Sequence, residues 1–426
     1  MIIHVVRPGE SLFSISRIYG VSADKIAKDN ELKDPRQLVI GESLVILEGE
    51  RKHAVAPGES IYTIARTYGM IPRAILVANP QITDPSKLKV GQIIIIPERT
   101  RKYGTIEVNG YAFPEIEMET LRKTLPNLTY LSIFNYQVMK DGSLKEIDDV
   151  PLIQAAREFK VAPLMVITNI EEGKGFSSDI AKEILTNNTA QENLLNNVIQ
   201  TLKAKNYYGL DIDFEYIYPE NREDYNNFLR KTVNRLKPLG YTVTTALAPK
   251  IAADQPGILY QGHDYPVHGA LVDHVILMTY EWGYTFGPPL AVAPLNEVVK
   301  VLNYAVTAIP REKIFMGIPN YGYDWTLPYV KGTAAKALSN TEAVNLAFRE
   351  GAIIQYDWKA QAPFFTYYDN AGRQHIVWFE DARSIRAKLD VANRYKLGGV
   401  SYWSIGKYFP QNWLILNSLY DVEKLI

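Results

Sequence analysis

From Gly104 to the end of the chain, short apolar runs typical of buried strands alternate with amphipathic stretches typical of helices. The helical stretches include Val150–Phe159, Thr189–Lys205 and Leu295–Ala308. This alternation is expected of parallel βα units, and eight of them close a TIM-type barrel. We therefore predict an α/β fold, a (β/α)8 TIM barrel over residues 104–426. The eight strand-like runs are Thr105–Phe113, Leu128–Tyr136, Leu164–Thr168, Tyr208–Phe214, Thr242–Leu247, His274–Thr279, Ile314–Pro319 and Gly399–Trp403.

The connection after the seventh run is too long for a simple loop. Residues 322–380 contain a helical pattern at Thr341–Arg349 and strand-like runs at Ile353–Tyr356, Phe364–Tyr368 and Ile376–Phe379. We expect a small α+β insertion at about 322–380. Loops that follow barrel strands lie at the catalytic face, so this insertion should wall one side of a cleft.

Three carboxylates alternate along the fourth run, at Asp211, Asp213 and Glu215. Spacing by two places them on one face of a strand, pointing into the barrel. Like charges in a partly dry site repel, so one of them should keep its proton to high pH, as a general acid requires. Glu215 lies closest to the catalytic end and is the expected acid. A solvated edge strand or a metal site is the alternative, and the flanking apolar residues disfavour the first.

The N-terminal part of the chain contains an internal repeat. The segment HVVRPGESLFSISRIYGV, from His4, matches HAVAPGESIYTIARTYGM, from His53, without a gap. Each unit of about 45 residues is predicted to fold as β-α-α-β, because Ser11 is placed to cap a first helix and Gly20 to end it. We place the units at 1–48 and 51–97, followed by a charged linker at 98–103.

Both units resemble the LysM module over their whole length, through the PGES helix start, the mid-repeat Asn30 and Asn79, and the apolar closing strand. The resemblance implies binding to glycans that contain N-acetylglucosamine, such as peptidoglycan or chitin. The alternative is a folded spacer without a ligand.

The barrel resembles the family 18 glycoside hydrolases, whose fourth strand reads D-G-x-D-x-D-x-E. Here Tyr208 replaces the first Asp of that motif. Met278-Thr279-Tyr280-Glu281 is similar to the sixth-strand M-x-Y-D, with Glu for Asp, and Gly398–Trp403 is similar to the eighth strand, whose Trp floors the sugar site. The third-strand S-x-G-G is missing, since Val166–Asn169 stands there.

The resemblance implies a role for each site residue. Glu215 would protonate the leaving oxygen, Asp213 would orient the substrate's acetamido group, Asp211 would tune Asp213, and Tyr280 would donate a hydrogen bond to the acetamide. Carboxylates on one strand face cannot flank a glycosidic bond as a nucleophile pair would, and family 18 uses the substrate's own acetamido oxygen, with retention of configuration. The expected substrate-binding residues are Met278, Glu281, Trp403 and Tyr321.

Composition narrows the possible partners. A formal charge of −1 favours neither nucleic acid nor an anionic membrane, and no apolar run approaches the roughly 20 residues of a membrane-spanning helix. Cysteine is absent, and the six histidines show no ligand spacing. We therefore predict no metal and no other cofactor, no nucleic-acid partner and no membrane partner, and leave the oligomeric state open.

Two LysM-like modules before a family 18-like barrel resemble the cortex-lytic glycosidases of Bacillus-type spores. The expected activity is that of an N-acetylglucosaminidase on spore cortex peptidoglycan during germination. Met1–Glu10 lacks the features of a secretory signal. A protein made in the mother cell and placed at the spore coat or cortex boundary would need no secretory signal. A chitinase, another endo-N-acetylglucosaminidase or a non-catalytic glycan-binding coat protein are the alternatives, and the intact Glu215 argues against the last.

Overall fold

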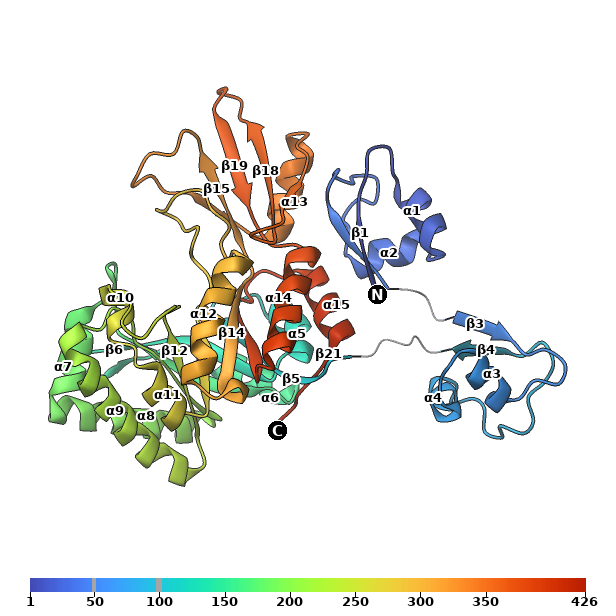
Figure 1. Ribbon diagram of the computed structural model, residues 1–426. Coiled ribbons are helices and arrows are strands. Elements are labelled where there is room, and N and C mark those ends of the chain that lie inside the picture. The colour runs from blue at the N-terminus through green and yellow to red at the C-terminus, as the bar shows by residue number, and fades with distance from the viewer. Residues whose placement is uncertain (48–50, 97–101) are drawn as a thin grey trace.

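The computed structural model describes residues 1–47, 51–96 and 102–426, and its main body is a closed barrel of parallel strands (Figure 1). Each barrel strand pairs in parallel with its neighbours, and the eighth pairs back onto the first. The predicted (β/α)8 fold is confirmed. The barrel strands are β5 (Gly104–Ala112), β6 (Tyr130–Val138), β8 (Ala162–Thr168), β11 (Gly209–Asp213), β12 (Thr242–Leu247), β13 (His274–Leu277), β14 (Ile314–Pro319) and β20 (Gly399–Trp403).

Helices surround the barrel because their apolar faces pack on the outer faces of the strands, in one continuous core. They are α5 (Met118–Thr124), α6 (Val150–Glu158), α7 (Ser178–Thr186), α8 (Asn188–Lys205), α9 (Arg222–Leu236), α11 (Tyr265–Leu271), α12 (Leu295–Ala308), α14 (Ala382–Tyr395) and α15 (Pro410–Leu419). The short helix α10 (Ile258–Gln261) contributes no buried residue to this core. Four short strands lie outside the eight barrel strands, and one of them, β21 (Tyr420–Val422), pairs with β5. The other three are β7 (Leu144–Lys145), β9 (Ile170–Glu171) and β10 (Gly175–Phe176).

The insertion after β14 is an antiparallel sheet with one helix, as the sequence predicts. Its elements are β15 (Gly322–Thr326), β16 (Lys336–Leu338), α13 (Asn340–Arg349), β17 (Gln355–Asp357), β18 (Ala362–Tyr368) and β19 (Gln374–Trp378), with strand order β16-β15-β19-β18-β17. A turn with Gly372 at φ 74° joins β18 to β19. The insertion stands above the barrel (Figure 1).

Each N-terminal unit is the predicted β-α-α-β. The first contains β1 (Ile2–Val5), α1 (Leu12–Tyr19), α2 (Ala23–Asp29) and β2 (Ser43–Ile46), and the second contains β3 (Arg51–Ala54), α3 (Ile61–Thr67), α4 (Pro72–Ala78) and β4 (Ile93–Ile96). In the first unit, buried Asn30 exchanges two hydrogen bonds with the main chain of Val45 and donates a third to Ile26 O. Asn79 makes the same set in the second unit. The mid-repeat Asn therefore joins the second helix to the closing strand.

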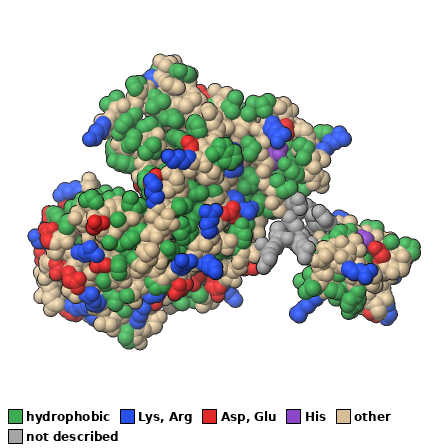
Figure 2. Space-filling view, viewed as in Figure 1, with side chains coloured by type: hydrophobic (Ala, Val, Ile, Leu, Met, Phe, Trp, Pro, Cys, Tyr) green, Lys and Arg blue, Asp and Glu red, His purple; other side chains and the backbone are tan. Residues whose placement is uncertain are grey.

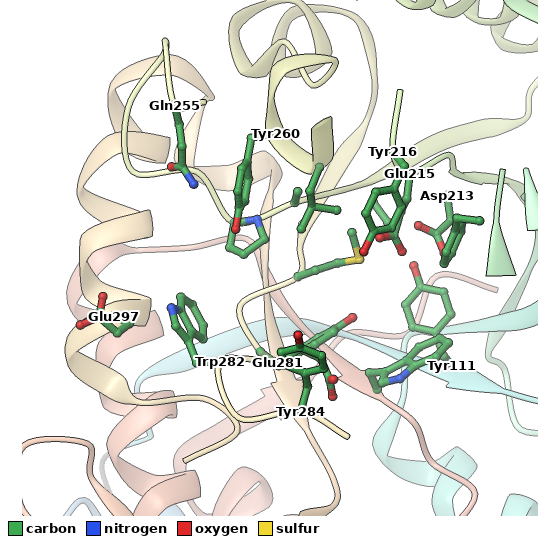
Figure 3. A pocket seen from close by; sticks show the side chains of 18 of the residues that line it. Tyr111, Asp213, Glu215, Tyr216, Gln255, Tyr260, Glu281, Trp282, Tyr284 and Glu297 are labelled. Carbon is green, nitrogen blue, oxygen red and sulfur yellow. The ribbon is translucent and has the colours of Figure 1, made fainter. Parts of the chain in front are cut away.

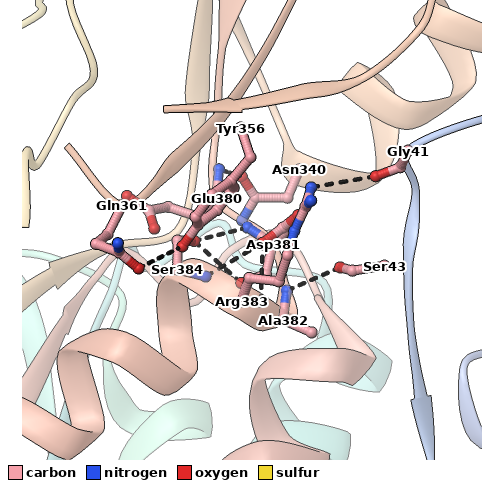
Figure 4. Close-up of polar contacts among 10 residues, drawn as sticks. All are labelled: Gly41, Ser43, Asn340, Tyr356, Gln361, Glu380, Asp381, Ala382, Arg383 and Ser384. Carbon is pink, nitrogen blue, oxygen red and sulfur yellow. Dashed lines mark hydrogen bonds and ion pairs between the residues drawn. The ribbon is translucent and has the colours of Figure 1, made fainter. Parts of the chain in front are cut away.

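The first unit packs against the barrel and the insertion. The Ser43 hydroxyl accepts the Ala382 N–H at 3.2 Å, and Gly41 O accepts from the Arg383 guanidinium at 3.1 Å (Figure 4). The Ile354 N–H donates to Ile40 O at 2.9 Å. A Cβ at Gly41 would lie 1.8 Å from Ile354 O, so only glycine fits this contact.

The second unit has no comparable contact within the described part of the chain: no hydrogen bond or ion pair between described residues joins it to the barrel or to the first unit. Gly91, the counterpart of Gly41, has open space around its Cβ position. The expected linker at 98–103 lies mostly among residues 97–101, outside the described residues. Figure 2 shows basic and acidic side chains interspersed over this face of the molecule, in keeping with the near-zero net charge.

Candidate active site

A cleft of about 560 Å³ opens at the carboxyl ends of the barrel strands. Six of the eight residues expected at the site line it: Asp213, Glu215, Met278, Tyr280, Glu281 and Trp403. Asp211 lies beneath them, and Tyr321 lines an adjoining cavity together with Glu281 and Trp403. The structure therefore brings together residues at or just after the ends of β11, β13, β14 and β20. Figure 3 shows Asp213, Glu215 and Glu281 around the cleft.

Asp211 and Asp213 point inward from β11, as their spacing predicts. Leu210 and Ile212, which alternate with the two carboxylates, are fully buried in the core between the barrel and its surrounding helices. The strand ends at Asp213, so Glu215 lies on the loop that follows, where Tyr216 has φ 54°. Glu215 is therefore held by the loop and not by the pleat of the strand.

Asn169, at the end of β8, fixes this loop. Its side-chain oxygen accepts the Glu215 N–H at 2.9 Å, and its amide donates to Glu215 O at 2.8 Å. Asn169 is fully buried, and its amide also donates to Ser177 O. It occupies the segment where the family motif on the third strand is missing.

Asp211 is fully buried and is held by two hydroxyl groups. Its Oδ2 accepts from Tyr111 at 2.6 Å and from Ser132 at 3.2 Å, while Oδ1 has no partner. Burial raises the pKa of Asp211 to about 6, although the two hydrogen bonds oppose this rise. Tyr111 and Ser132 come from β5 and β6, and nothing in the sequence pattern pointed to either.

Asp213 and Glu215 both favour the protonated form more than ordinary carboxyl groups. Burial raises the pKa of Asp213 well above its ordinary value, and the charges of Glu215 and Asp211 add to this. The pKa of Glu215 rises to about 8, through burial first and the charge of Glu281 second. Asp213 Oδ1 is buried without a partner. At neutral pH the cluster therefore holds protons that separate carboxyl groups would release.

Glu281 lies across the cleft from Asp213 and Glu215 (Figure 3), and its neighbour Tyr280 lines the same cleft. Tyr280 packs against β14 at Gly317, where a Cβ would lie 2.8 Å from its ring. The Glu281 carboxylate accepts hydrogen bonds from the hydroxyls of Tyr321 and Tyr323. Burial raises the pKa of Glu281, and these two hydrogen bonds oppose the rise.

Trp403 lies at the end of β20 between the cleft and the aromatic residues of β5 and β6. Its ring meets Tyr111 and Phe134 edge-on, with centroids 5.2 and 4.9 Å apart. These contacts fix the plane of the indole. Further aromatic residues line the same cleft, namely Tyr216, Tyr260, Trp282 and Tyr284. The sequence signalled them only through its 28 Tyr and 6 Trp.

The histidines that lie near this end of the barrel are structural. His263 is fully buried, accepts the Ala248 N–H and donates to Phe214 O, so burial lowers its pKa to about 4. Among residues 1–47, 51–96 and 102–426, no group of three His, Asp or Glu side chains is placed to hold a metal ion. Within the same ranges, no helix has both the length and the apolar character needed to cross a bilayer.

A TIM barrel with a carboxylate cluster and an aromatic cleft at its catalytic face defines a glycoside hydrolase. The model of glycosyl hydrolases family 18 matches residues 113–407, and the LysM domain model matches residues 4–47 and 53–97. The chain therefore belongs to family 18 of the glycosyl hydrolases and carries two LysM domains.

Particular relatives share this whole arrangement. The chain is 41% identical over 431 residues to the cortical fragment-lytic enzyme of Bacillus subtilis (strain 168), covering 100% of this chain and 99% of the relative. It is similar to the crystal structure of the Bacillus megaterium QM B1551 spore cortex-lytic enzyme SleL, with 42% identity, a TM-score of 0.87 and coverage of 100% and 99%. A chitinase from Chromobacterium violaceum ATCC 12472 is similar to 74% of this chain and 98% of its own, at 25% identity and a TM-score of 0.69.

Proposed function

We propose that this glycoside hydrolase is an N-acetylglucosaminidase that cuts spore cortex peptidoglycan by a retaining, substrate-assisted mechanism. The observation that carries the proposal is the pairing of Asp213 and Glu215. Both carboxyl groups belong to one short segment, both have raised pKa values, and Asp213 has a buried oxygen without a partner. Two carboxyl groups on the same side of a sugar cannot act as acid and nucleophile from opposite faces.

In the first step, Glu215 gives its proton to the glycosidic oxygen as the bond from that oxygen to C1 breaks. The acetamido oxygen of the same sugar bonds to C1 and forms an oxazolinium ion. In the second step, Glu215 takes a proton from a water molecule as that water attacks C1. The bond from C1 to the acetamido oxygen breaks, which opens the oxazolinium ring and restores the acetamido group. Two displacements at C1 retain its configuration. The raised pKa of Glu215, about 8, keeps the proton available at neutral pH.

Asp213 is placed to stabilise the acetamido group during this displacement, because it lines the cleft with Glu215 and has a carboxyl oxygen without a partner. Tyr280 would donate its hydroxyl hydrogen to the acetamido oxygen, and Asp211 would tune Asp213 through their mutual repulsion. Met278, Glu281, Trp403 and Tyr321 would hold the sugar, with the Trp403 ring as the floor.

The mechanism selects the bond that is cut, because the sugar on the non-reducing side must carry a free acetamido group. Muramic lactam lacks one, so in cortex the cut falls after N-acetylglucosamine. The names of relatives similar over the whole chain support cortex as the substrate. We assign residues 1–48 and 51–97 to modules that bind peptidoglycan glycan and 104–426 to the catalytic domain, with its insertion at about 322–380. We place the protein at the spore coat or cortex boundary, where it acts in germination.

Mass spectrometry of digests tests the proposal. Cortex fragments released by a muramidase and, separately, chitin oligomers are incubated with the wild-type protein and with Glu215→Gln. We expect new reducing ends at N-acetylglucosamine in the cortex digest, absent with Glu215→Gln. New reducing ends at muramic acid, beyond those that the muramidase itself produces, or no cleavage of cortex fragments, would overturn the proposal.

A chitinase is the second candidate. The aromatic cleft and the similarity to the Chromobacterium violaceum chitinase favour it. Cleavage of chitin oligomers without cleavage of cortex fragments in the same experiment would select this alternative.

A further inference from the structure

The catalytic cleft continues into a second cavity of about 330 Å³, which we call the side chamber. Glu281 and Trp403 line both spaces, so the two adjoin at these residues. The chamber is also lined by Asn320, Tyr321, Tyr323, Ser404 and Lys407. Its volume suits one sugar ring with a short substituent, and its position next to Trp403 makes it the place for a sugar that neighbours the reacting one.

Lys407 distinguishes the side chamber from the rest of the cleft. It lies on the loop after β20, and it is the one basic residue that lines either cavity within the described part of the chain. No hydrogen bond or ion pair to a described residue is formed by its ammonium group. Two acidic side chains are near: Glu281, which lines the same chamber, and Glu342, whose pKa the Lys407 charge helps to lower. Neither lies within the 4.0 Å of an ion pair, so the cation is available to a ligand.

The loop that carries Lys407 is held in place from below. Asn320 is buried, and its amide donates to Ser404 O at 3.1 Å and to Lys407 O at 2.6 Å. The Tyr321 and Tyr323 hydroxyls are already engaged with Glu281. Lys407 and the Ser404 hydroxyl are thus the polar groups left for a ligand on this side of the chamber.

The chemistry of the glycan supplies a matching group. In peptidoglycan, N-acetylglucosamine alternates with muramic acid, so both neighbours of a reacting N-acetylglucosamine are muramic sugars. Muramic acid carries a lactyl carboxylate, or a short peptide that ends in a carboxylate. Chitin has no such group, and in muramic lactam the carboxyl group is consumed by the ring.

We propose that the side chamber is a carboxylate-recognising subsite, in which Lys407 binds the lactyl or peptide carboxylate of the muramic acid next to the reacting sugar. The proposal rests on the proposed peptidoglycan substrate and deepens it. An ammonium group left unpaired beside Glu281 would also balance the negative charge of the site once an anionic sugar arrives. The enzyme would then prefer muramic acid to muramic lactam at this position.

Steady-state kinetics on three matched substrates test the subsite. The substrates are chitin oligomers, peptidoglycan glycan fragments freed of peptides so that the lactyl carboxylate is exposed, and the same fragments with that carboxylate capped as a methylamide. Fragments that keep their stem peptides form a further arm that separates a lactyl from a peptide carboxylate. The variants are Lys407→Met, Lys407→Arg and, as the control, Lys331→Met, an exposed lysine that lines neither cavity.

We expect Lys407→Met to lower kcat/KM on a carboxylate substrate about 5-fold, mostly through KM, and to leave chitin and capped fragments unchanged. Lys407→Arg should restore most of the loss, and Lys331→Met should have no effect. Equal loss on all substrates, or no loss on either carboxylate substrate, would overturn the subsite. A wild-type protein that cuts chitin but no peptidoglycan fragment would overturn the proposed substrate itself, so the two failures are distinguishable.

Discussion

The side chain of Asn169 holds the main chain of Glu215 on both sides, accepting its N–H and donating to its carbonyl oxygen. Because Glu215 lies beyond the end of β11, no hydrogen bond between paired strands fixes its main chain. The two hydrogen bonds from Asn169, which directly follows β8, fix it instead. The proposed general acid is thus positioned by the residue that directly follows a neighbouring strand.

We predict that Asn169→Ala lowers kcat more than 10-fold with little change in KM. Each lost hydrogen bond is worth about 1 kcal/mol, and a displaced acid delivers its proton poorly. Steady-state kinetics on cortex fragments measure the split. Asn193→Ala, which removes an exposed amide bonded to Asp141 O, serves as the control and should leave both constants unchanged. A rise in KM with constant kcat would show instead that Asn169 shapes the binding of the sugar.

The pH profile should report the influence of Glu281 on Glu215. The charge of Glu281 raises the pKa of Glu215, which is about 8, and activity requires the protonated acid. Activity should therefore fall as the pH rises through about 8. In Glu281→Gln the repulsion is gone, so the alkaline limb of kcat/KM should move to lower pH. An alkaline limb that stays in place would mean that Glu281 does not act on the acid.

The contact between the first LysM module and the insertion can be tested with a matched pair of glycines. Gly41 and Gly91 both have positive φ, 86° and 78°, so an alanine is strained at either position. Only at Gly41 would the new Cβ collide, 1.8 Å from Ile354 O. Gly41→Ala should therefore lower Tm clearly more than Gly91→Ala. Equal losses in thermal denaturation would show that this contact contributes nothing to stability.

A buried carboxyl group in the same module makes stability depend on pH. Glu42 is 6% exposed and accepts the Val39 N–H, and burial raises its pKa to about 7. The folded state thus binds the proton more tightly than the unfolded chain. The stabilisation is complete below the ordinary value of 4.5 and is lost as the pH rises through about 7.

Glu42→Gln should remove this dependence. At pH 8 the variant should be more stable than the wild type by about 3 kcal/mol, and the difference should vanish below pH 4.5. Chemical denaturation at a series of pH values measures it. Gln92→Glu, at the half-buried equivalent position of the second module, is the control and should change little. A constant difference between Glu42→Gln and the wild type at every pH would contradict the burial argument.

The sequence predicted the barrel closely because each strand and helix has its own local pattern. Three expected strands match the observed bounds: Thr242–Leu247, Ile314–Pro319 and Gly399–Trp403. The spacing of Asp211 and Asp213 placed them on one face, as observed. Glu215 departs from the pattern because the backbone turns after Asp213, with Tyr216 at positive φ.

The remaining site residues depend on contacts between distant segments. Tyr111 and Ser132 meet Asp211 only after the barrel closes, and no local pattern marks them. The contact between the first module and the insertion corresponds to one difference between the two repeats in the sequence. Val39 is buried against the insertion, while Lys89 takes its place in the second module. That difference shows which repeat has a partner, but not what the partner is.

The acetamido group of the substrate is the central element of the proposed mechanism, and its removal is the most direct test of that proposal. We would compare the rate of cleavage of cortex glycan fragments before and after N-deacetylation of the reacting glucosamine, with binding measured in parallel on Glu215→Gln. The account predicts that cleavage is lost while the deacetylated fragment still binds. Cleavage at a comparable rate would contradict it and would point to a carboxylate of the protein, with Glu281 the one placed across the cleft, as the nucleophile.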